Sequence, residues 1–90
     1  MGEGALVAPT PLSVAFGQVL RELREAEGLS QEALSFRAER HRTFVSLIER
    51  GQSTPTMATL WLLADALGAR PSQVLEMVEQ RLASPTPPVS

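Results

Sequence analysis

The chain has 90 residues, a formal net charge of −2 and no cysteine. A chain of this length forms one domain with stability on the order of 4–9 kcal/mol, so a second subunit would help to stabilise it. The lack of cysteine and the single histidine, His41, exclude disulfides, thiolate zinc sites and histidine-pair metal centres. No catalytic triad, phosphate loop or cofactor motif occurs, so we expect neither an enzyme nor a cofactor.

Glu3 and nearby prolines do not suit a signal peptide, and no apolar run reaches membrane-spanning length. A soluble cytoplasmic protein without a membrane partner is therefore expected.

Positive charge is concentrated in the middle of the chain. Residues 36–50 hold four arginines against two glutamates, whereas the stretch before Leu29 is net acidic. The net charge argues mildly against nucleic-acid binding, but a local basic segment can still supply the contacts to phosphate. All eight basic residues are arginine, which suits bidentate recognition, although a genome-wide codon bias would give the same composition.

The termini differ from the interior in composition. Gly2, Gly4, Pro9 and Pro11 predict a flexible tail over residues 1–11, and a proline-rich stretch predicts a disordered tail over residues 83–90. The domain is therefore expected over residues 12–82. Within it, apolar spacing and capping residues predict five helices, at 13–26, 31–38, 42–50, 57–67 and 71–82. No strand pattern competes, so the fold class is all-α.

Turn and cap residues separate these helices. Ser30 and Thr56 are good N-caps, and Pro71 fits the first turn of the last helix. Helices 31–38 and 42–50 are too short to be stable alone, so they need packing from the others. The apolar positions that predict this packing are Ala33, Leu34, Ala38, Val45, Ile48, Met57, Leu60, Leu63, Ala64 and Leu67. The pattern indicates a helix-turn-helix at about residues 31–50.

The segment LRELREAEGLSQEALSFRAERHRTFVSLIERGQSTPTMATLWLLADALG, residues 20–68, resembles the lambda repressor/Cro-like (XRE-type) helix-turn-helix family without a gap. GLSQEAL, SLIERG and the Pro-Thr-x-x-x-Leu pattern at 55–60 carry the resemblance. HRTFVSLIERG is most similar to the small controller proteins of restriction–modification systems. The resemblance implies a compact five-helix lambda-repressor-like domain and a DNA-binding regulator, repressor or activator, of transcription.

In that family the second helix of the motif enters the major groove. Residue-by-residue matching implies that base edges are read by Arg42, Thr43, Ser46 and Leu47. It implies contacts to the DNA backbone, or bracing of the reading helix, by Gln31, Arg50, Gln52, Ser53 and Thr54. Leu47 could instead belong to a subunit interface. Phe44 could either flank the phosphates or be partly buried, and His41 at the N-cap favours capping over DNA contact.

The family also pairs the glutamate of its ERG triplet with an arginine of the first helix. The matching residues here are Glu49 and Arg24, which we interpret as a structural ion pair. Two positions in the turn depart from the family pattern. Glu39 replaces a glycine, and Arg40 stands where a buried aliphatic residue is usual; a longer or looser turn here would shift the aim of Arg42 while the fold is kept.

The last two predicted helices carry more apolar surface than a small core needs. Trp61 and Leu75 are expected to complete the core, whereas Leu62, Val78 and Met77 are candidates for a twofold interface, since family members commonly dimerise through this region. A homodimer would place two reading helices about 34 Å apart on a pseudo-palindromic operator.

The net acidity and the irregular turn favour a second hypothesis. The same helical domain could be an antitoxin-like protein-interaction module whose partner is a toxin-like protein or a transcription component such as RNA polymerase.

Overall fold

The computed structural model describes residues 8–83, which form five helices and no strand. The helices are α1 (Pro11–Ala26), α2 (Gln31–Ala38), α3 (Arg42–Glu49), α4 (Met57–Ala66) and α5 (Pro71–Ala83). The predicted all-α fold is thus confirmed. The two predicted tails lie largely outside the described residues. None of the five helices is long and apolar enough to cross a membrane.

Helix α1 begins two residues before the predicted start. Thr10 and Ser13 form a reciprocal capping box, with Pro11 in the first turn. The hydroxyl of Ser13 is buried and also donates a hydrogen bond of 2.8 Å to the carbonyl of Gly51, just beyond α3. The start of α1 is therefore bonded to the end of α3.

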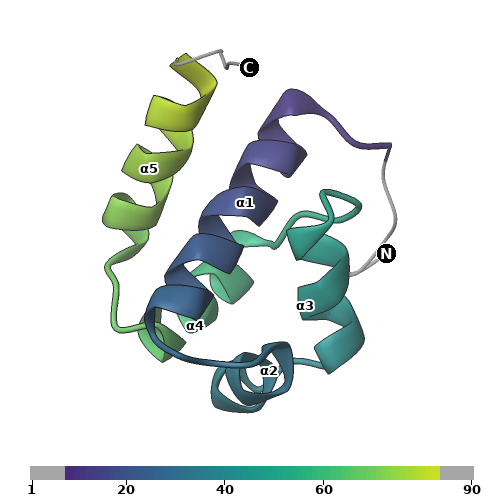
Figure 1. Ribbon diagram of the computed structural model, residues 1–90, viewed down its shortest axis with the longest axis vertical. Coiled ribbons are helices and arrows are strands. Elements are labelled where there is room, and N and C mark those ends of the chain that lie inside the picture. The colour runs from purple at the N-terminus through teal and green to yellow at the C-terminus, as the bar shows by residue number, and fades with distance from the viewer. Residues whose placement is uncertain (1–7, 84–90) are drawn as a thin grey trace.

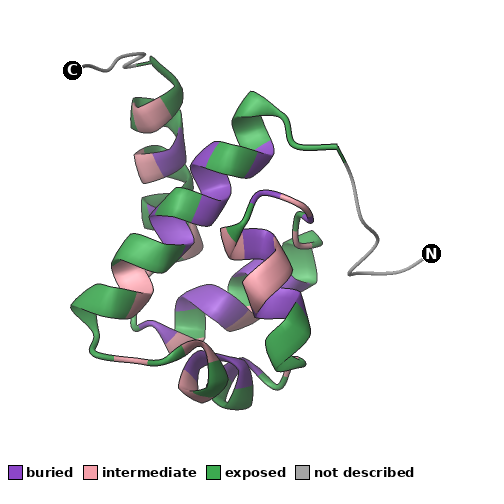
Figure 2. Ribbon diagram, turned by 45° about the vertical axis from the view of Figure 1, so that its right-hand side comes forward, coloured by how far each residue is buried: buried purple, intermediate pink, exposed green. Residues whose placement is uncertain are grey.

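The five helices pack around one core (Figure 1). Helix α1 packs against α3 and α5, while α2 packs against α3 and α4. Figure 2 shows that the buried residues line the inward sides of the helices. Fully buried large apolar side chains come from all five helices, namely Val19, Leu20, Leu34, Val45, Ile48, Leu63 and Val74. Met57, the first residue of α4, was expected in this core but is 70% exposed.

The contact between α1 and α3 depends on a glycine. A Cβ atom at Gly17 would lie 2.3 Å from the carbonyl oxygen of Ile48 and 2.8 Å from that of Glu49. Both atoms belong to the backbone, so a side chain at position 17 would force the two helices apart. Gly17 thereby sets the depth at which α3 sits on α1.

Candidate nucleic-acid interface

Helix α3 divides into a buried side and an exposed side. Phe44, Val45 and Ile48 are buried, which answers the open question about Phe44. The residues predicted to read bases lie on the other side: Arg42 and Thr43 are exposed, and Ser46 and Leu47 are half-buried. Because these four positions are spaced i, i+1, i+4 and i+5, they form one continuous polar and apolar strip along the helix. Arg42 and Thr43 lie at its N-terminal end, where the helix dipole is positive.

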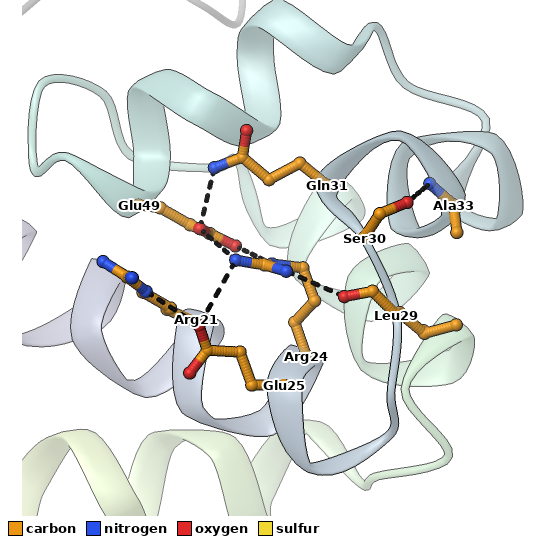
Figure 3. A network of polar contacts seen from close by, with 8 residues as sticks. All are labelled: Arg21, Arg24, Glu25, Leu29, Ser30, Gln31, Ala33 and Glu49. Carbon is orange, nitrogen blue, oxygen red and sulfur yellow. Dashed lines mark hydrogen bonds and ion pairs between the residues drawn. The ribbon is translucent and has the colours of Figure 1, made fainter.

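An ion pair joins the end of α3 to α1 on the side of α3 that faces the core. The Nε and Nη2 atoms of Arg24 donate to the two carboxylate oxygens of Glu49 at 2.6 and 3.0 Å, and Nη1 donates to the carbonyl of Leu29 at 2.7 Å (Figure 3). The side chains of Arg24 and Glu49 are only 11% and 3% exposed. The hydrogen bond that Arg24 donates to Glu49, more than the charge of Glu49, raises the pKa of Arg24, while burial opposes the rise. Arg24 therefore stays charged, and its bidentate geometry fixes the end of α3 against α1.

Gln31 joins this network from α2. Its side-chain amide donates to Glu49 at 2.9 Å, so Gln31 supports the buried side of α3 (Figure 3). After α3, Arg50 and Thr54 are exposed and Gln52 is half-buried. Ser53 is different, because it is 1% exposed and its hydroxyl has no hydrogen-bond partner. The expectation that the Ser53 side chain contacts DNA is corrected, since a hydroxyl below the surface cannot reach a phosphate.

The unusual turn between α2 and α3 keeps the backbone shape that a glycine would give. Glu39 has φ 57° and ψ 43°, and it is the only non-glycine residue with positive φ in the described part of the chain. Arg40 is half-buried and donates from Nε to the hydroxyl of buried Thr59 at 3.1 Å. The arginine thus ties the turn to α4 by a hydrogen bond, where an aliphatic residue would do so by packing.

Glu39→Gly is expected to stabilise the protein by about 1 kcal/mol, because a side chain in left-handed backbone costs roughly that much. The measurement is the free energy of unfolding in urea. Glu39→Ala is the control, since it removes the same charge but keeps the unfavourable backbone conformation. Equal stability of the two variants would contradict the explanation.

His41 occupies the N-cap of α3. Its Nδ1 atom accepts a hydrogen bond of 3.1 Å from the backbone N–H of Thr43. The imidazole ring itself is exposed beside Arg42. The expected capping role is therefore present in the structure.

The exposed apolar side chains differ from those that the sequence predicted. Val78 is 3% exposed and belongs to the core, so the prediction that it lies in a subunit interface was wrong. Leu62 and Met77 are half-buried and pack against the core. Trp61 and Leu75, expected inside, are 55% and 44% exposed. Leu75 lines an apolar hollow of about 150 Å³, together with Leu12, Phe16, Thr54, Pro55, Thr56, Met57 and Leu60.

Two residues that position α3 were not singled out from the sequence. Gly17 allows the close approach of α1, and Ser13 bonds to the carbonyl of Gly51. A glycine inside an otherwise amphipathic helix is a signal for close packing, so Gly17 could have been found. The bond from Ser13 depends on tertiary contact, for which the sequence has no local signal.

A short helix braced from behind, with its polar side outward and a second helix across it, defines a helix-turn-helix domain. The helix-turn-helix domain family model matches residues 15–77, and the chain belongs to this family. Control protein C.BamHI of Bacillus amyloliquefaciens is 35% identical over 66 residues, which are 72% of this chain and 82% of that protein.

Solved structures of similar sequence are also helix-turn-helix controller proteins. The restriction–modification controller protein C.AhdI from Aeromonas hydrophila is 45% identical, with a TM-score of 0.68 over 69% of this chain and 94% of that one. A variant of C.Esp1396I bound to its highest affinity operator site is 27% identical, with a TM-score of 0.77 over 83% of this chain and 99% of that one. The resemblance to lambda repressor/Cro-like proteins, and to controller proteins among them, is thus confirmed.

Proposed function

We propose that this protein is a sequence-specific DNA-binding regulator of transcription, which acts as a homodimer on a pseudo-palindromic operator in the cytoplasm. Helix α3 would lie in the major groove of each half-site. The observation that carries the proposal is the exposed strip of Arg42, Thr43, Ser46 and Leu47 on a helix whose opposite side is buried and bonded to α1 and α2. Similarity to a controller protein solved on its operator supports it.

The chemistry of the strip suits base edges. The guanidinium of Arg42 can donate two hydrogen bonds to guanine O6 and N7, and the methyl groups of Thr43 and Leu47 can contact a thymine methyl. Exposed Arg50 and Thr54, with half-buried Gln52, lie in sequence just after α3, where donors can bind phosphates on either side of the groove. Residues 42–54 hold two arginines against one glutamate, Glu49, and the carboxylate of Glu49 is paired with Arg24.

The homodimer is supported by the apolar side chains on the surface. Leu12, Met57, Trp61 and Leu75 are all exposed, and three of them line the apolar hollow. A domain this small gains stability by covering such side chains with a second copy. We therefore assign the twofold interface to this surface, in place of the interface of Leu62, Met77 and Val78 that the sequence suggested.

The test is selection of bound sequences from a random DNA pool, followed by light scattering of the protein with and without the selected DNA. We expect one enriched inverted repeat whose half-sites are about one helical turn apart, and a dimer at micromolar concentration. A monomer in both states would exclude the homodimer. A pool without any enriched sequence would exclude specific DNA reading.

An unenriched pool would favour the second candidate function, a protein-interaction module. Its supporting observation is Phe36, which is 85% exposed on α2. A phenylalanine so far out of the core suits contact with another protein, such as RNA polymerase or a toxin-like partner.

A further inference from the structure

His41 accepts a hydrogen bond at one ring nitrogen and leaves the other exposed. The bond from Thr43 N–H ends on Nδ1, so this nitrogen carries no proton while the cap is formed. A neutral imidazole has one N–H and one acceptor nitrogen, which places the proton on Nε2. The cap thereby selects one tautomer and creates a single N–H donor on the exposed edge of the ring.

The location of this donor matters because it lies at the N-terminus of the proposed reading helix. His41 is exposed, as are the adjacent Arg42 and Thr43. Within residues 8–83, the only hydrogen bond of the His41 side chain is the one that Nδ1 accepts. A neutral donor at a helix N-terminus, where the dipole is positive, suits an anionic oxygen.

We infer that His41 has two functions at once: Nδ1 caps α3, and Nε2–H donates to a phosphate oxygen of the DNA backbone as Arg42 enters the groove. The inference rests on the proposed function of α3 and adds one contact to it. Because the donor is neutral, it releases no counterion, so the contact should add affinity without adding to the salt dependence of binding. Because phosphates carry no sequence information, it should add affinity to every DNA equally.

His41→Ser is the decisive variant, since serine is a preferred N-cap but is too short to offer the outward donor. We expect an unchanged urea midpoint and a loss of about two- to tenfold in affinity, equal for operator and for unrelated duplex DNA, with the same salt slope. His41→Ala is the matched control, which should lose the same affinity and also lose stability.

If His41→Ser bound DNA with wild-type affinity, the proposed phosphate contact would be overturned. A loss confined to the operator would indicate a base contact, and a salt slope reduced by about 0.9 would indicate a histidine cation; either result would overturn the inference.

The tautomer has its own measurement. Because His41 is the only histidine of the chain, its ring signals in heteronuclear NMR need no assignment. We expect an unprotonated Nδ1 and a protonated Nε2 in the free protein, and the opposite tautomer would overturn the inference.

Arg42→Ala, assayed for DNA binding in parallel, separates failure of the His41 contact from failure of the proposed function. If wild type and Arg42→Ala bind all sequences alike, specific reading fails, while the His41 contact is still measured on unrelated DNA.

Discussion

Replacing Glu49 by alanine is expected to cost about 3–5 kcal/mol in the free energy of unfolding, because Arg24 would keep its charge in a nearly buried site without its partner. The glutamate also accepts the amide of Gln31, so the variant breaks three hydrogen bonds between α3 and its supports. A loss of this size approaches the whole stability of so small a domain. Urea unfolding followed by circular dichroism measures it.

Glu25→Ala is the matched control for this prediction. The carboxylate of Glu25 lies 3.9 Å from the same arginine, but its side chain is 56% exposed. Exposed ion pairs contribute at most about 1 kcal/mol, so this variant should unfold close to wild type. If the two alanine variants were equally stable, burial of the Arg24–Glu49 pair would not be what holds α3.

Replacing Arg42 by alanine is expected to weaken binding to the selected operator by about 1–3 kcal/mol per half-site, while binding to unrelated DNA falls much less. Arg42 is exposed, so the fold should be unaffected. Fluorescence anisotropy with both kinds of DNA measures the ratio of the two affinities. A ratio unchanged from wild type would remove Arg42 from base reading.

Two arginine variants complete this experiment. Arg42→Lys keeps the charge but not the bidentate geometry, so it should retain affinity for unrelated DNA and lose preference for the operator. Arg21→Ala removes the same charge from α1, where Arg21 is exposed and pairs with Glu25. It should leave the preference for the operator intact.

Local signals in the sequence predicted the helices well. Ser30 before α2 and Thr56 before α4 accept hydrogen bonds from the expected backbone groups, and the bounds of α2 agree with prediction. These features depend on neighbouring residues only. The start of α1 was missed because Pro11 was interpreted as part of a tail, whereas a proline is favourable in the first turn of a helix.

The surface of α4 and α5 was predicted less well. Trp61, Leu62 and Leu63 are consecutive apolar residues in a helix, so they point in different directions, and periodicity alone cannot decide which one is inside. The neighbours decide it: Leu63 is buried, Leu62 lies at the edge of the core, and Trp61 is exposed. The same limit applies to the consecutive residues Val74 and Leu75 in α5, of which Val74 is buried and Leu75 is exposed.

The candidate site was predictable on α3 and less so in the following loop. Alternation of polar and apolar residues placed the outer side of α3, but nothing in the GQSTP segment distinguishes the buried Ser53 from the exposed Thr54. The left-handed backbone of Glu39 agrees with the family pattern, which has a glycine at this position, but glutamate itself gives no local signal for it, because the turn imposes that conformation.

The contact at Gly17 separates the position of α3 in the fold from the DNA preference of its exposed strip. The backbone of α1 at Gly17 contacts the backbone at the end of α3 and sets how closely the two helices approach, while Arg24, Glu49 and Gln31 fix the orientation of α3. Thr43, Ser46 and Leu47 contribute no side-chain hydrogen bond or ion pair to that support. A lineage, or an engineer, could therefore change the DNA preference by substitutions on the outer strip while leaving the scaffold as it is.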